Sequence, residues 1–125
     1  MYCYTYINGQ FQIRTVAANY KAKSGEVLFQ NCASSDVQLA AAFPQYALDE
    51  GVKNFIATVK ALLAQGDLTN KRICEAISLG SNSWNKKDIV DWVNYQRALR
   101  ALLSVAIDPA KLPTIPTQPA YPAGT

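Results

Sequence analysis

Carboxylates and cysteines are the side chains through which this sequence could do chemistry, because it contains no histidine. Without imidazole, Ser-His-Asp and Cys-His nucleophile systems and the commonest nitrogen ligand of zinc are excluded. Two carboxylate pairs remain, Asp49 with Glu50 and Asp88 with Asp91. Both pairs fall where a helix is expected to begin, and acidic residues there stabilise the helix dipole. We therefore interpret them as helix-start residues and not as a catalytic acid and base.

The three cysteines, Cys3, Cys32 and Cys74, lie far apart, and none belongs to a Cys-x-x-Cys pattern. Their spacing matches no zinc module, so we expect reduced and mostly buried thiols, with Cys74 on the apolar side of its helix. The glycines are scattered and form neither a GxGxxG nor a Walker pattern. The sequence thus predicts a non-enzymatic protein, with no catalytic residue, no cofactor, no metal site and no small-molecule substrate.

Composition limits the class of partner. The chain has 125 residues, half of them apolar, and 12 Lys and Arg against 9 Asp and Glu, for a net charge of +3. This charge is too small and too widely spread to favour a nucleic-acid or anionic membrane partner. No apolar run approaches the ~20 residues that span a bilayer, and the first residues lack the pattern of a secretion signal. We expect a protein that is made and kept in a cytoplasm.

A β-hairpin region is predicted over residues 1–31. Asn8-Gly9 lies between two runs of aromatic and β-branched residues, and this pair favours a type I′ turn, whose two central residues both need positive φ. Alternation places Phe11 on a face with a matching row of tyrosines, at positions 2, 4 and 6. Residues 26–30 follow a break at Ser24-Gly25 and predict a short third strand.

A helical region is predicted over residues 35–107, and its first helix has clear end signals. Ser35 and Gln38 are spaced as in a capping box, and Pro44 is expected to end the helix that follows. The last helix is expected to begin at Asn85-Lys86-Lys87-Asp88. Its apolar stripe consists of Ile89, Trp92, Val93, Gln96, Leu99, Leu102, Leu103 and Ala106.

Between these two helices, apolar residues at helical spacing predict two further helices. The first covers 47–65 and is expected to end before Gly66. The second covers 69–79, carries Ile73 and Ile77 on its apolar side and is expected to stop at Gly80. The helical region is therefore a small bundle of three to four helices.

The end of the chain is rich in proline. Five of the six prolines follow Asp108, and four recur at every third residue, which is the repeat of a polyproline II helix. Leu112, Ile115 and Tyr121 add apolar side chains that a merely solvated tail would not need, so we predict an arm that packs on its own domain or on a neighbour. The predicted architecture is α+β, with one domain over 1–108 and an extended arm over 109–125.

Five stretches of the sequence are informative in their order along the chain. They are SGEVLF (24–29), LAAAFPQY (39–46), WVNYQRALR (92–100), LP (112–113) and PAYPAGT (119–125). Together they make up less than a third of the chain, and their order resembles that of small tail-region proteins of tailed bacteriophages and prophages. The helix over 92–100 with its proline-rich end is also similar to phage tail-fibre assembly proteins.

The resemblance implies a non-enzymatic structural protein of the phage tail, in the baseplate or at the fibre attachment, assembled in the host cytoplasm and retained in the virion. One alternative is an assembly chaperone that helps fibres to trimerise and then leaves. Fibre-assembly proteins generally end in a segment rich in Trp and Pro, and this end contains no tryptophan, so the virion role ranks first. A small regulator of a host protein is another alternative, and a lysis enzyme ranks last.

We predict that side chains of the sheet and of the arm bind other tail proteins, in an oligomer or a hetero-complex, because tyrosines at a surface commonly mark protein contacts. The same aromatic residues beside Arg14, Lys21 and Lys23 could stack on single-stranded nucleic acid, but no RNP-like run accompanies them. The predicted partner-binding residues are Tyr4, Tyr6, Phe11, Leu112, Pro113, Ile115, Pro116, Pro119, Tyr121 and Pro122.

Overall fold

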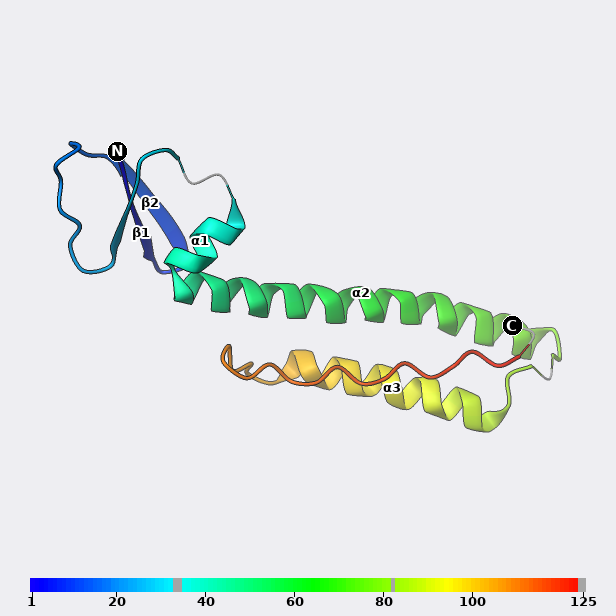
Figure 1. Ribbon diagram of the computed structural model, residues 1–125. Coiled ribbons are helices and arrows are strands. Elements are labelled where there is room, and N and C mark those ends of the chain that lie inside the picture. Colours follow the sequence, from blue (N-terminus) through cyan, green and yellow to red (C-terminus); the bar gives the residue numbers. More distant parts are fainter. Residues whose placement is uncertain (33–34, 82, 124–125) are drawn as a thin grey trace. The chain divides into compact units, whose positions relative to one another are not determined.

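The computed structural model describes residues 1–32, 35–81 and 83–123 (Figure 1). Within these residues, three strands are followed by three helices, which confirms the α+β class. The elements are β1 (Tyr2–Ile7), β2 (Gln10–Thr15), β3 (Glu26–Phe29), α1 (Asp36–Ala42), α2 (Pro44–Ser78) and α3 (Lys86–Ser104).

The chain divides into two compact units, Met1–Gly51 and Val52–Thr125. The sequence predicts a different division, with one domain over 1–108 and an arm over 109–125. The division found here lies inside α2, because the first unit is built on the sheet and the second on the paired helices. Residues 109–123 belong to the second unit, and residues 124 and 125 of the predicted arm lie outside the described residues.

The first unit contains an antiparallel sheet with strand order β2-β1-β3. Asn8 and Gly9 both have positive φ, 52° and 77°, as the type I′ turn between β1 and β2 requires. Tyr6 lies opposite Phe11 in the register of these two strands, so the matching aromatic rows are confirmed. The predicted third strand is confirmed as β3, which pairs with β1.

The helix α1 begins and ends as its sequence predicts. The Ser35 side chain accepts a hydrogen bond of 3.3 Å from the backbone N–H of Gln38, which satisfies one of the free donors of the first turn. The helix closes at Phe43, and Pro44 then begins α2. A proline suits this first position, because its missing N–H would have no partner there.

The prediction of two separate helices over 47–65 and 69–79 is wrong, because α2 runs without interruption for 35 residues. Gly66 does not end a helix, and it is buried inside this one. A Cβ on residue 66 would lie 3.2 Å from Nε2 of Gln96, so the missing side chain leaves room for Gln96. Glycine is needed here for a close approach between helices.

The second unit has its core between α2 and α3, which lie side by side in Figure 1. Asn85 caps α3, since its side chain accepts a 2.9 Å hydrogen bond from the N–H of Asp88. The predicted stripe is confirmed at Trp92, Gln96 and Leu99, whereas Val93 is exposed. Ala106 is also exposed, because α3 ends at Ser104. The buried core residues are Phe55, Val59, Ile73, Trp84, Trp92, Tyr95 and Leu99.

Candidate protein-binding surfaces

The aromatic row of the sheet is covered by helix residues of its own unit. Phe11 has its ring centroid 4.8 Å from that of Tyr6, 4.9 Å from Tyr46 and 5.4 Å from Phe43. Phe43 and Tyr46 come from the junction of α1 and α2, and the sequence analysis treated that junction only as a helix end. Tyr4 is 2% exposed and therefore offers no surface to a partner. Contacts of Tyr6 and Phe11 with another protein stay a prediction.

A carboxylate holds this aromatic cluster to the start of α2. The hydroxyl of Tyr6 donates a 2.6 Å hydrogen bond to Asp49, which also accepts a 2.9 Å bond from the amide of Gln45. The bond to Asp49, together with burial, raises the pKa of Tyr6 to about 12. The prediction that Asp49 and Glu50 are helix-start residues is wrong, because α2 begins at Pro44 and its first turn contains no acidic residue. Asp49 instead joins the sheet to a helix of the same unit, which is a long-range role.

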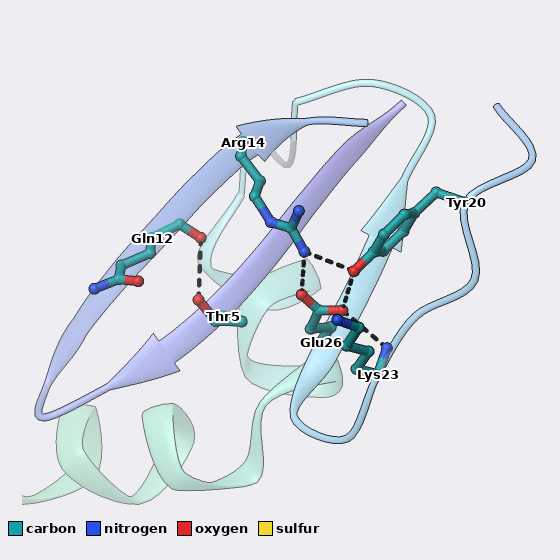
Figure 2. Close-up of polar contacts among 6 residues, drawn as sticks. All are labelled: Thr5, Gln12, Arg14, Tyr20, Lys23 and Glu26. Carbon is teal, nitrogen blue, oxygen red and sulfur yellow. Dashed lines mark hydrogen bonds and ion pairs between the residues drawn. The ribbon is translucent and has the colours of Figure 1, made fainter. Parts of the chain in front are cut away.

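The opposite face of the sheet carries a polar network, drawn in Figure 2. The guanidinium of Arg14 donates to the hydroxyl of Tyr20 at 2.6 Å and to the carboxylate of Glu26. The Tyr20 hydroxyl donates to the Glu26 carboxylate at 2.7 Å, and the backbone N–H of Lys23 donates to the same carboxylate at 2.8 Å. The bond from Lys23, followed by those from Tyr20 and Arg14, lowers the pKa of Glu26 to about 2.

This network uses groups that the nucleic-acid alternative would need. The charge of Arg14 is paired with Glu26, and its guanidinium also lies 5.0 Å from the centroid of the Tyr20 ring. Cys3 is buried beside them, and burial raises the pKa of its thiol. A buried, protonated thiol is a poor nucleophile, so we interpret the network as structural.

The cysteines are only partly as expected. All three are free, but Cys32 and Cys74 are exposed, which corrects the prediction of mostly buried thiols. Cys74 follows Ile73, the residue that enters the core, and so faces away from it. Ile77 was likewise assigned to the apolar side of its helix and is 61% exposed. Both errors arise because the single long helix turns a different face toward α3.

Tyr121 attaches the C-terminal segment to the helices of the second unit. Its hydroxyl is 3.0 Å from the hydroxyl of Thr69, and its ring centroid is 4.8 Å from that of Trp92 and 6.2 Å from that of Trp84. The guanidinium of Arg72 lies over the same ring, 5.5 Å from its centroid. In Figure 1 the segment runs back beside α3 toward the turn that joins α2 to α3.

The four prolines that recur at every third residue differ in exposure from Pro109, which is exposed. Pro113, Pro116, Pro119 and Pro122 are each partly buried, whereas Thr114, Thr117, Gln118 and Ala120 between them are exposed. Ile115 packs against the core of the unit. Leu112 and Tyr121 remain 40% and 42% exposed. Of the side chains predicted to bind a partner, these two are therefore the most available on the segment.

The second carboxylate pair, Asp88 with Asp91, lies near the start of α3. Asp88 lies in the first turn of α3, and Asp91 forms a 3.0 Å ion pair with Lys87 one turn away. Across residues 1–32, 35–81 and 83–123, no group of three His, Cys, Asp or Glu side chains is arranged to hold a metal ion. Nor does any helix in those ranges have the length and apolar character needed to cross a bilayer.

The sequence analysis missed one exposed apolar region of α2. Leu68 and Leu79 are 61% and 84% exposed, and a hollow of about 450 Å³ lies beside Leu79. Their spacing of 11 residues, three helical turns, is the signal that could have shown that they share a face. The hollow is lined by Arg72, Glu75, Ala76, Leu79, Ser81, Ser83 and Trp84.

Comparison of the chain with models of protein families, with curated proteins and with solved structures finds no match.

Proposed function

We propose that the chain is a non-enzymatic component of a bacteriophage tail, in the baseplate or at the fibre attachment, where it binds neighbouring tail proteins. In this proposal residues 109–125 form an extended arm beside a bundle that includes α2 and α3. The observation that carries it is the exposure of Leu112 and Tyr121, at 40% and 42%, on a segment in which Pro113, Pro116, Pro119 and Pro122 are partly buried and Ile115 packs against the core of its own unit.

An extended segment of this kind suits a permanent assembly. Residues 112–123 contain no helix or strand, so their backbone N–H and C=O groups are not paired in regular secondary structure. A neighbouring chain can bond to these groups while it covers the two apolar side chains. Because Tyr121 is already attached to Thr69 and Trp92, little conformational freedom remains to be lost when the neighbour binds.

Mass spectrometry of purified tail particles tests the role. We expect the chain in mature particles at a fixed ratio to other tail proteins. Leu112→Asp should reduce incorporation without changing the unfolding temperature, because the side chain is exposed. Thr114→Asp adds the same charge at an exposed position two residues away and should be incorporated normally.

The alternatives give different results in the same experiment. A chaperone would co-purify with fibre protein from infected cells and be absent from mature particles. A regulator would co-purify with one host protein and with no tail protein. Either result would reject the virion role.

A further inference from the structure

Four residues of α2 form a stripe on its exposed side, which we call the 68–79 stripe: Leu68, Arg72, Glu75 and Leu79. Their spacings of four, three and four residues keep them on one side of the helix. All four are exposed, and the two leucines are 61% and 84% exposed. The face that packs toward α3 is a different one and includes Gly66, Thr69 and Ile73.

The residues of the 68–79 stripe, Leu, Arg, Glu and Leu in chain order, are complementary to the same residues in reverse order. When a second α2 lies antiparallel, with the two-fold axis between residues 73 and 74, Leu68 faces Leu79 and Arg72 faces Glu75. Two-fold symmetry repeats each pair, giving two leucine contacts and two ion pairs. A parallel second copy in the same register would place Arg72 against Arg72, which like-charge repulsion disfavours.

The hollow beside Leu79 supports the same arrangement. Arg72, Glu75, Ala76 and Leu79 line it at the i, i+3, i+4 and i+7 positions, which is how four residues of one helix surround a side chain inserted from another. Trp84 also lines it. The antiparallel register brings the Leu68 side chain of the second copy to the level of Leu79, at the edge of this hollow.

The charges of Arg72 and Glu75 are available for such a contact. Glu75 makes no ion pair with any residue in the described part of the chain. The guanidinium of Arg72 is held at the surface over the ring of Tyr121, 5.5 Å from its centroid. Glu75 thus lacks an ionic partner among the described residues of its own chain, and Arg72, the complementary charge, is oriented by its own unit.

We propose that two copies of this chain associate through the 68–79 stripe, with their α2 helices antiparallel. The occupant of the exposed face is a second copy, because the sequence of charges along the stripe is its own complement. This inference does not rest on the proposed tail function, and self-association can be measured with the purified full chain alone.

Exchange of the charges tests the register. Sedimentation velocity of the full chain over a concentration series should show a monomer and a dimer in equilibrium. Arg72→Glu alone faces Glu75 with a like charge, and Glu75→Arg alone faces Arg72 in the same way. Each variant should associate at least tenfold more weakly than the parent chain. Arg97→Glu makes the same charge change as Arg72→Glu at an exposed position of α3, and it should associate normally.

Mixing the two single variants is the decisive step. In the mixed pair, Glu at position 72 faces Arg at position 75 and the two natural residues face each other, so both ion pairs return. The mixture should therefore form dimers that neither variant forms alone, and the double variant R72E/E75R should also recover. A chain that stays monomeric at every concentration, a dimer unaffected by either single change, or a mixture that fails to associate would overturn the proposal.

Folding of the variants is checked by their unfolding temperatures. Arg72→Glu also removes a contact with Tyr121, but Glu75→Arg leaves that contact in place. If Arg72→Glu does not fold, Glu75→Arg and Leu79→Ser decide the question, because both residues are exposed and each change should weaken association of a folded chain at least tenfold. Normal dimerisation of both folded variants would reject the interface.

Discussion

Gln96 of α3 lies against Gly66 of α2, and its Nε2 atom donates a 3.3 Å hydrogen bond to the Gly66 carbonyl oxygen. The same side-chain amide exchanges two hydrogen bonds, of 3.1 Å and 3.0 Å, with the side-chain amide of Asn70. A buried amide is thereby satisfied between two helices. A Cβ at position 66 would lie 3.2–3.3 Å from the Gln96 side chain, which is tighter than ordinary contact, so glycine lets this pairing form without displacing Gln96.

This relationship predicts that Gly66→Ala destabilises the second unit. Alanine favours helix by about 1 kcal/mol over glycine, but its Cβ would lie 3.2 Å from Nε2 and 3.3 Å from Cδ of Gln96. Displacing Gln96 would break bonds to Gly66 and Asn70, and we expect a net loss of about 1–2 kcal/mol in urea unfolding. Gly51→Ala is the matched control, since its Cβ meets open space, and should stabilise by about 0.5–1 kcal/mol. Equal gains for both variants would contradict this account.

The network around Glu26 predicts a loss of stability in acid. The pKa of Glu26 is about 2 in the folded protein and 4.5 ordinarily, so protonation favours the unfolded chain. The stabilising contribution is fully present above pH 4.5 and is lost as the pH falls through 2. Glu26→Gln should be less stable at neutral pH. Its urea midpoint should also change less between pH 4.5 and 2 than that of the parent protein. Parallel curves for the two proteins would show that the carboxylate is not held as described.

The bond from Tyr6 to Asp49 predicts the opposite behaviour in base. The pKa of Tyr6 is raised from 10 to about 12 in the folded protein, so ionisation favours the unfolded chain. The contribution of this bond is fully present below pH 10 and is lost as the pH rises through 12. Tyr6→Phe should remove this part of the alkaline loss, and tyrosinate absorbance should lose one late-titrating group. An unchanged late titration would contradict the assignment.

The contacts of Tyr121 predict that the C-terminal segment stabilises its own unit. From the sequence alone, truncation after Asp108 would leave the unfolding temperature nearly unchanged. The packing of Ile115 on the core and of Tyr121 on Trp92 instead predicts a loss of about 2–4 kcal/mol on truncation. Tyr121→Phe removes only the hydroxyl contact with Thr69 and should cost about 1 kcal/mol. Thermal unfolding of both variants measures the two effects, and an unaltered truncated protein would show that the segment is not held.

The sequence alone determined the features that depend on neighbours a few residues away. Asn8-Gly9 specifies a turn because both residues tolerate positive φ, and Ser35 and Asn85 specify helix starts because their side chains reach a backbone N–H three residues ahead. Strand alternation placed Tyr6 opposite Phe11 for the same local reason.

Only the tertiary structure decided which faces are covered. Gly66 looks like a helix stop until Gln96, 30 residues later, comes to lie against it, and Tyr121 reaches Thr69 across 52 residues. In such contacts, side chains of distant segments leave water and pack against each other. Local sequence preferences do not specify which distant segments will pack together. The turns and helix starts follow from short-range hydrogen bonds and backbone sterics. The continuity of α2, the cover over Tyr6 and the exposure of Leu79 follow from packing between distant parts of each unit.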